Sequence, residues 1–285
     1  MAVDCRAPAN TAEYLSQTIC VKKVNSSILK LTILGIFAGV FIGFGAQFAT
    51  LVGHDLGKYF GVGFTKLIMG AVFSVGLMLV VIAGAELFTG NNLIILSALD
   101  KHTTWKRVFR NWLIVYFANF LGSILLVYLI VWSGLWKTNG YHSGAFALKI
   151  ANAKVNLSFL EAFTRAILCN WLVCLAVWMA IASRNVVGKI FAIMFPIMAF
   201  VASGYEHSVA NMFFIPKGIM LKSYPEVIKA AGLSIDKLTN LTWGNFIVKN
   251  LIPVTLGNII GGAFFVAFLY WIVFLKPAPK DEKNS

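Results

Sequence analysis

Charged side chains are scarce in this sequence, and acidic ones are the scarcest. Only 12% of the 285 residues are charged, with 11 Asp and Glu against 24 Lys and Arg, while 59% are hydrophobic. Soluble domains carry about 25% charged and about 45–50% apolar residues. This composition excludes a soluble globular domain and predicts an integral membrane protein. The net charge is +13, but the basic residues lie between apolar segments and form no stripe with stacking aromatics. We therefore expect no nucleic-acid partner.

Motifs of several other protein classes are also missing. The four cysteines form no CxxC pair and have no histidine at metal-binding spacing, which predicts reduced structural thiols and no metal site. No Gly-x-x-x-x-Gly-Lys-Ser/Thr phosphate loop occurs, so we expect no ATP-driven pump, no cofactor and no enzymatic activity. The N-terminal segment holds Asp4, Arg6 and Glu13 but no continuous apolar run, which argues against a cleaved signal peptide.

Apolar segments long enough to cross or enter a bilayer, which needs roughly 20 residues per crossing, recur along the chain. The predicted spans are 31–52, 67–88, 112–132, 166–182, 190–205 and 251–275, with polar connections at 133–158 and 217–249. With six spans, both termini lie on one side together with the basic patches at 22–30, 101–110 and 184–189. The positive-inside rule makes that side the cytoplasm. We therefore expect a multi-pass protein of the bacterial inner membrane, in contact with the lipid bilayer.

The spans define the predicted domains. These are a cytoplasmic N-terminal segment over 1–27 that can form an interfacial helix, a transmembrane channel domain over 28–276 and a cytoplasmic tail over 277–285.

Two of the spans are interrupted by the same polar pattern. Gly-x-Glu-x-x-x-x-Asn occurs at 84–91 and again at 204–211. Paired interruptions of this kind mark the binding site in transporters that are built from repeats. Asn-x-x-Gly also occurs in the third span of each half, at Asn119 and Asn258. Since each half has three spans, the predicted fold is all-α, with six transmembrane helices as two inverted three-helix repeats in which helices 2 and 5 are broken.

The polar residues at the breaks predict a site for an anion. His207 can change charge near neutral pH, so it can bind an anion or lend it a proton. Half-helices that begin near Asn91 and Ser208 would point their positive dipole ends at the breaks. Glu86 and Glu206 are predicted to accept hydrogen bonds from backbone N–H groups that the breaks release.

Glycines at helical spacing mark the first and last spans. Gly35, Gly39 and Gly43 form one small-xxx-small stripe, and Gly257 with Gly261 forms another. Such stripes let helices approach closely, and we expect them to support assembly.

At four segments, 84–90, 169–179, 202–211 and 253–258, the sequence resembles the formate/nitrite transporter family, and the likeness extends over about 30–275. The resemblance implies an aquaporin-like protomer, a homopentamer around a central axis, a pore through each protomer and an N-terminal helix that gates from the cytoplasm. It also implies roles for single residues. They are a pore histidine at His207, hydrogen-bonding neighbours at Thr89 and Asn170, a vestibule lysine at Lys154, hydrophobic constrictions at Leu87, Phe200, Phe73 and Leu77, and structural residues at Glu86, Asn91, Glu206 and Asn211.

The position of each constriction follows from the topology. We expect Leu87 and Phe200 on the cytoplasmic side of the breaks, and Phe73 and Leu77 toward the outside.

The resemblance leaves several substrates open, because family members carry formate, nitrite, hydrosulfide or lactate. Segments 211–216 and 245–253 are similar to the formate branch, while 204–207 and 169–171 also resemble the nitrite branch. We expect a channel for small monovalent anions with formate as its substrate, and nitrite or hydrosulfide as alternatives. An aquaporin-like channel for neutral solutes is an alternative of a different class, although neither break carries Asn-Pro-Ala.

Overall fold

A computed structural model describes residues 5–277 of the chain, and within that range all regular structure is helical. The α-helices are α1 (Pro8–Tyr14), α2 (Val21–Val24), α3 (Ile28–Met78), α4 (Ile95–Leu99), α5 (Trp105–Trp132), α6 (His142–Val155), α7 (Phe159–Ala182), α8 (Val186–Ser203), α9 (Ser208–Leu221), α10 (Pro225–Ala231), α11 (Trp243–Asn245), α12 (Ile252–Ile259) and α13 (Leu269–Phe274). π-helical stretches cover Leu15–Cys20, Leu79–Gly84, Phe246–Leu251 and Ile260–Phe268, and 3-10 turns cover Gly90–Ile94, Leu135–Lys137 and Ile235–Leu238. The first four residues, and the predicted tail beyond Pro277, lie outside the described range.

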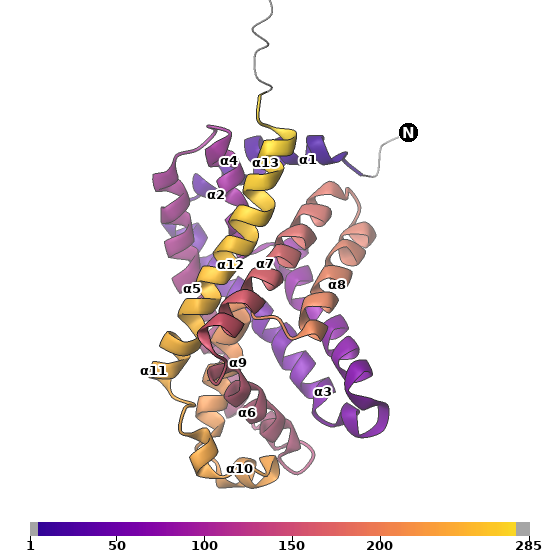
Figure 1. The fold of residues 1–285 in the computed structure, drawn as a ribbon, viewed down its shortest axis with the longest axis vertical. Coiled ribbons are helices and arrows are strands. Elements are labelled where there is room, and N and C mark those ends of the chain that lie inside the picture. The colour runs from indigo at the N-terminus through magenta and orange to yellow at the C-terminus, as the bar shows by residue number, and fades with distance from the viewer. Residues whose placement is uncertain (1–4, 278–285) are drawn as a thin grey trace, which may run out of the picture.

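Membrane-length apolar helices dominate this part of the chain. They are Ile28–Gly84, Trp105–Trp132, Phe159–Ala182, Val186–Ser203 and Trp243–Phe274. The first has 57 residues, far more than the roughly 20 that one crossing needs. At Gly61 its backbone leaves the helical region, with φ 75° and ψ 172°, a conformation that glycine adopts readily. The chain doubles back there, so this segment supplies the two separate spans that the sequence predicts (Figure 1).

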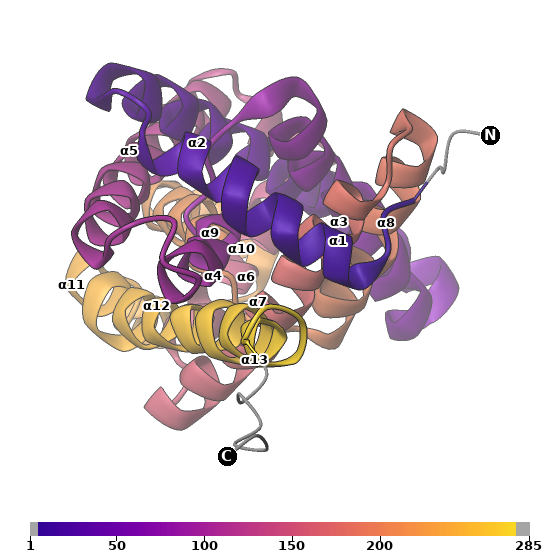
Figure 2. The ribbon, with the colours of Figure 1, turned by 90° about the horizontal axis from the view of Figure 1, so that it is seen from above.

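Both ends of the described chain lie at one end of the molecule, where α1 and α13 are found (Figure 1). We call this the terminal end, and the opposite end, where α6 and α10 lie, the far end. The helix that contains α1 and α2 runs across the bundle at the terminal end (Figure 2). Between the ends, α4 extends toward the terminal end and α9 toward the far end (Figure 1). The two short helices therefore leave the middle of the molecule in opposite directions.

Two segments that the sequence predicts as polar connections contain helices. Segment 133–158 includes α6, which buries Ala147, Ala151 and Val155, while its residues Lys149 and Lys154 remain at least partly accessible. Segment 217–249 begins with the last turn of α9, which ends at Leu221, and contains α10. The sequence did not show α6 because that helix is amphipathic rather than uniformly apolar.

The glycine stripes bring helices together within the protomer. A side chain on Gly39 would collide with the backbone of Asn119 and Ser123 on α5. On the last span, Gly257 faces α7 and has the carbonyl group of Phe163 as its nearest neighbour. The expectation that these stripes support assembly is therefore corrected, because their neighbours are helices of the same chain.

Substituting one of these glycines tests the close packing. We expect Gly39→Ala to destabilise the protein by about 1–3 kcal/mol, because the added methyl meets backbone that cannot move aside cheaply. Gly244→Ala is the matched control, because nothing lies within 4 Å of a Cβ added there. Thermal unfolding followed by tryptophan fluorescence measures both variants. Equal melting temperatures for the two would contradict the packing argument.

Candidate functional site

Two stretches of unwound backbone form the centre of the site. The π-helical end of the second span stops at Gly84, with φ 96°, and helical structure resumes at Gly90. On the other half, α8 ends before Gly204, with φ 74°, and α9 begins at Ser208. Both predicted breaks are therefore present. Each leaves backbone N–H and C=O groups without helical partners inside apolar segments.

An asparagine from a neighbouring helix takes up these backbone groups at each break. Asn119 Oδ1 accepts from Phe88 N–H at 2.9 Å, and its Nδ2 donates to the carbonyl group of Glu86 at 2.9 Å. Asn258 does the same on the other half, accepting from Ser208 N–H at 2.8 Å and donating to the carbonyl group of Glu206 at 3.0 Å. These amides replace the lost helical hydrogen bonds. The sequence marked both asparagines as repeat positions but did not reveal this role.

A part-buried ion pair also supports the first break. Glu86 Oε2 accepts from Lys23 Nζ at 2.9 Å and from Asn91 Nδ2 at 2.8 Å. Asn91 also donates to Asn111 Oδ1 at 2.9 Å. We call Lys23, Glu86, Asn91 and Asn111 the first cluster. Through it, the N-terminal helix is bonded directly to the second span.

The second break carries the same arrangement. Glu206 Oε1 accepts from Lys154 Nζ at 2.7 Å, and Glu206 Oε2 accepts from Asn211 Nδ2 at 2.6 Å. Asn211 donates in turn to Asn250 Oδ1 at 2.8 Å. We call Lys154, Glu206, Asn211 and Asn250 the second cluster. The prediction that the two carboxylates accept backbone N–H groups is wrong, since lysine and asparagine side chains hold both.

His207 lies at the start of α9, and its hydrogen bonds specify one form of the ring. Nδ1 accepts from the backbone N–H of Ala210 at 3.1 Å, so a neutral ring carries its proton on Nε2. Nε2 lies 2.9 Å from Thr89 Oγ1 and donates to it in this form. An imidazolium would instead turn Nδ1 into a donor facing Ala210 N–H. The observed hydrogen bonds therefore fit the neutral ring.

Asn170 contacts the backbone around the His207–Thr89 pair and not the histidine ring. Its Nδ2 donates to the carbonyl groups of Thr89 at 3.2 Å and Asn258 at 2.7 Å, and to Asn92 Oδ1 at 2.8 Å. No bond from Asn170 to His207 occurs among the described residues. The predicted contact with the histidine is therefore indirect, because Asn170 fixes the backbone that presents Thr89.

Two cavities approach the breaks from opposite ends. The far cavity, of about 150 Å³, is lined by His207, Lys154, Phe73 and Phe200, among others. Its two phenylalanine rings meet edge to face with centroids 5.6 Å apart, and the Phe200 ring stacks on His207 at 6.0 Å. Lys154 has a carboxylate partner there, so its charge is largely compensated.

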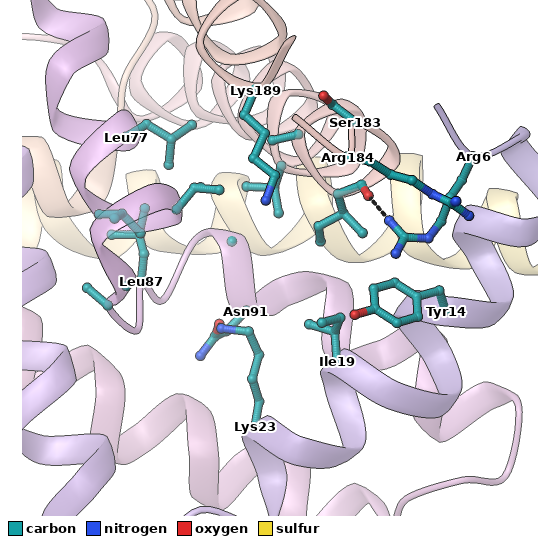
Figure 3. A pocket seen from close by; sticks show the side chains of 18 residues that line it. Arg6, Tyr14, Ile19, Lys23, Leu77, Leu87, Asn91, Ser183, Arg184 and Lys189 are labelled. Atoms are coloured by element: carbon teal, nitrogen blue, oxygen red, sulfur yellow. Dashed lines mark hydrogen bonds between the residues drawn. The ribbon is translucent and has the colours of Figure 1, made fainter. Parts of the chain in front are cut away.

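The terminal cavity, of about 470 Å³, is lined by Leu77 and Leu87 near the first break and by basic side chains at its mouth (Figure 3). The structure therefore groups the apolar residues as Leu77 with Leu87 and Phe73 with Phe200. The predicted grouping, Leu87 with Phe200 and Phe73 with Leu77, is therefore wrong. Where a helix is broken, the end of the molecule that a residue faces no longer follows from its position along the span. Spacing in the sequence therefore does not show it.

No group of three or more His, Cys, Asp or Glu side chains among residues 5–277 could hold a metal ion. All four cysteines are free.

Comparison with known proteins decides the family. The family profile described as "Formate/nitrite transporter" matches residues 9–272. This chain belongs to the formate/nitrite transporter family. It is therefore a multi-pass membrane protein of a transport family.

Two named relatives are similar to this chain over nearly their whole length. The "Probable formate transporter" of Methanothermobacter thermautotrophicus is 44% identical over 291 residues, covering 97% of this chain and 100% of the relative. The "Formate channel FocA" of Escherichia coli (strain K12) is 41% identical, covering 96% of each chain.

Solved structures of the family share the fold. The "Pentameric formate channel with formate bound" has a TM-score of 0.79 at 40% identity, covering 87% of this chain and 98% of that one. The "FNT family ion channel" has a TM-score of 0.70 at 29% identity, covering 93% of this chain and 95% of that one.

Breaking one buried ion pair tests whether the clusters hold the breaks. We expect Lys154→Met to destabilise the protein by about 3–5 kcal/mol, because it leaves Glu206 charged and buried without its cation. Arg165→Met is the matched control. It removes the partner of Glu161 in an ion pair whose side chains are about half exposed, so the melting temperature should change little. A larger loss in Arg165→Met than in Lys154→Met would contradict the role given to the second cluster.

Proposed function

We propose that this protein is a channel for small monovalent anions, with formate as its main permeant. The observation that carries the proposal is the His207–Thr89 hydrogen bond, which joins the two helix breaks between two pairs of apolar side chains. Relatives named as formate channels or transporters, similar over nearly the whole chain, support formate as the substrate. The structural neighbour described as pentameric and formate-bound supports a homopentamer.

The proposed topology follows the repeated contacts. The two breaks, their asparagines and the two clusters correspond one to one, which supports two inverted three-helix repeats over 28–276. With the basic patches on the cytoplasmic side, the terminal end faces the cytosol and the far end faces outward, in a bacterial inner membrane. The segment 1–27 and the tail 277–285 are then cytoplasmic.

The pore we propose runs from the terminal cavity to the far cavity. A permeant passes Leu77 and Leu87, reaches Thr89 and His207 at the breaks, and leaves past Phe73 and Phe200. His207 is the N-cap of α9, so the positive end of that helix dipole points toward the permeant. Lys154 lines the far cavity, and its cluster shapes the pore wall there.

The two apolar constrictions favour passage of a neutral species. Formic acid, with a pKa near the roughly 3.3–3.7 of an α-carboxyl group, is almost fully ionised at neutral pH. Between apolar side chains the charged form loses its water, and desolvation favours the protonated form. The anion therefore gains a proton as it enters the slit and releases it on the other side. Transport is proton-linked in this account.

The proton comes from a hydronium ion or a buffer acid in the solution on the entry side rather than from His207. Sequence reasoning assigned its transfer to a protonated histidine, but the hydrogen bond from Ala210 N–H fits the neutral ring. A neutral ring can still contribute to permeation, because its Nε2–H and the Thr89 hydroxyl group are hydrogen-bonding groups that lie between the two apolar pairs.

Two substitutions of His207 separate these roles. Asparagine can accept the Ala210 N–H as an N-cap but cannot ionise, whereas phenylalanine can do neither. We expect His207→Asn to keep formate flux within about tenfold of wild type and to keep its rise at low pH. Flux in His207→Phe should fall by more than about tenfold, because Thr89 and Ala210 N–H lose their partner. Stopped-flow uptake into liposomes at several pH values measures both. If His207→Asn lost the pH dependence of formate flux, the histidine ring would be the proton donor, and this account would be contradicted.

Shortening the constrictions tests the selectivity. We expect Leu87→Ala and Phe200→Ala to raise the leak of ions such as chloride, because a wider slit lets an ion keep part of its water. Leu113→Ala, at an exposed leucine on α5, is the matched control. Chloride currents in planar bilayers measure the leak. Unchanged selectivity in both constriction variants would show that these side chains do not constrict the pore.

A solute panel tests the proposed function itself. Liposome flux should be fastest for formate, slower for nitrite and hydrosulfide, and at background for glycerol and water. Glycerol flux above background with none for formate would favour the channel for neutral solutes. Native mass spectrometry of the same preparation should show a pentamer.

A further inference from the structure

The mouth of the terminal cavity carries a concentration of positive charge. Arg6, Lys23, Arg184 and Lys189 line the cavity, and no acidic residue is among its lining residues in the part of the chain described. Figure 3 shows Arg6 and Arg184 at one end of the cavity and the Lys189 side chain extending into it. The charges come from two places in the sequence, the N-terminal segment and the stretch that includes the α7–α8 turn and the first turn of α8.

These cations differ in how far they are compensated. Lys23 is paired with Glu86 in the first cluster. Arg184 and Lys189 have no side-chain hydrogen bond and no salt bridge among residues 5–277. The guanidinium group of Arg6 donates one bond, from Nη1 to the carbonyl group of Ile181 at 2.6 Å, and lies 4.0 Å from the centre of the Tyr14 ring. Within residues 5–277, three cations therefore face the cavity without a carboxylate partner.

Arg6 also fastens the N-terminal segment to the rim of the cavity. Besides the Ile181 bond, its backbone N–H donates to the carbonyl group of Ala182 at 2.9 Å. These acceptors belong to the C-terminal turn of α7; Arg184 lies in the turn that follows, and Lys189 lies in the first turn of α8. An anion that bound Arg6 together with Arg184 or Lys189 would therefore join the segment to the α7–α8 turn or to the start of α8.

The size of the cavity and the character of its walls select the kind of anion. About 470 Å³ is many times the roughly 30 Å³ that one water molecule occupies in the liquid, so the cavity holds far more than formate. Its walls also include Ile19, Val81, Val177 and Ile181, which suit methylene groups. Guanidinium and ammonium groups on two sides, with apolar walls between them, match a short chain with a carboxylate at each end.

We propose that Arg6, Arg184 and Lys189 form a binding site for a small dicarboxylate, which ties the N-terminal segment across the mouth of the pore and slows formate flux. The binding step stands on the cavity alone. The effect on flux, and the cytosolic origin of the ligand, rest on the proposed function and orientation.

Isothermal titration calorimetry on the purified full-length protein tests the binding step. Succinate is the probe, acetate is the matched monoanion, and ionic strength is held constant with sodium chloride. We expect saturable binding of succinate. Acetate should bind at least about tenfold more weakly, because it has no second carboxylate to pair with the cations at the other part of the site. The double variant Arg184→Gln with Lys189→Gln should bind succinate at least about tenfold more weakly than wild type. Lys106→Gln, at an exposed lysine on α5, should leave the affinity unchanged.

Formate flux then tests the consequence. With succinate on both sides of the liposome membrane, wild-type flux should fall relative to flux in acetate, and this ratio should return toward one in the double variant. Absence of saturable succinate binding, equal binding of acetate, or an unchanged affinity in the double variant would overturn the site. Succinate binding without any effect on flux would overturn the tie across the mouth. A protein that binds succinate as described but carries no formate would refute the proposed function and leave the binding site standing.

Discussion

Backbone polar groups that leave a helix inside a membrane must find new partners, because no water in the hydrocarbon can replace them. This chain interrupts two spans at equivalent positions, and the rest of the architecture follows from satisfying those groups. Asn119 and Asn258 each provide one acceptor and one donor at the place where a helical turn is missing. Their helices must lie close enough for a short side chain to reach, and the glycine stripes allow this approach. The packing of the bundle and the shape of the site therefore depend on the same constraint.

Buried charge is the second consequence of the breaks. Removing an ion pair from water costs free energy that attraction between the partners recovers only when the remaining donors and acceptors are also satisfied. In both clusters asparagine side chains donate further hydrogen bonds to the glutamate carboxylate, although Asn211 Oδ1 in the second cluster has no hydrogen-bond partner among the described residues. Because each lysine is compensated by its glutamate, neither cluster presents a strong uncompensated charge to a permeant. What remains at the centre is a neutral imidazole, a hydroxyl group and the positive end of α9.

Sequence reasoning located the breaks because their residues are local and unusual in apolar surroundings. Glu86, Glu206 and His207 are visible as isolated polar residues, and the repeated spacing predicted that they correspond. The lysine partners were not predictable in the same way. Lys23 is 63 residues from Glu86 and Lys154 is 52 residues from Glu206, so only the fold brings each pair together. Asn111 and Asn250 were missed for the same reason.

Spacing along the chain also could not show which apolar residues face each other. Leu77 lies before the first break and Leu87 lies within it, and both line the same cavity, although a continuous helix would separate them along its axis by about 15 Å. The prediction placed them on opposite sides because it used only their order along the broken span. Similarly, α6 was read as a polar connection because only one of its faces is apolar, and the helices that cover this face come from distant sequence.

The central claim is that the hydrogen bonds at the second break hold His207 as a neutral ring with its proton on Nε2. Nitrogen NMR of histidine-labelled protein in lipid at neutral pH tests this most directly, with the spectrum of His207→Asn identifying the signals that belong to this one of the four histidines. The account predicts one protonated nitrogen, assigned to Nε2, and one unprotonated nitrogen, assigned to Nδ1. Two protonated nitrogens, or a proton on Nδ1 alone, would contradict it.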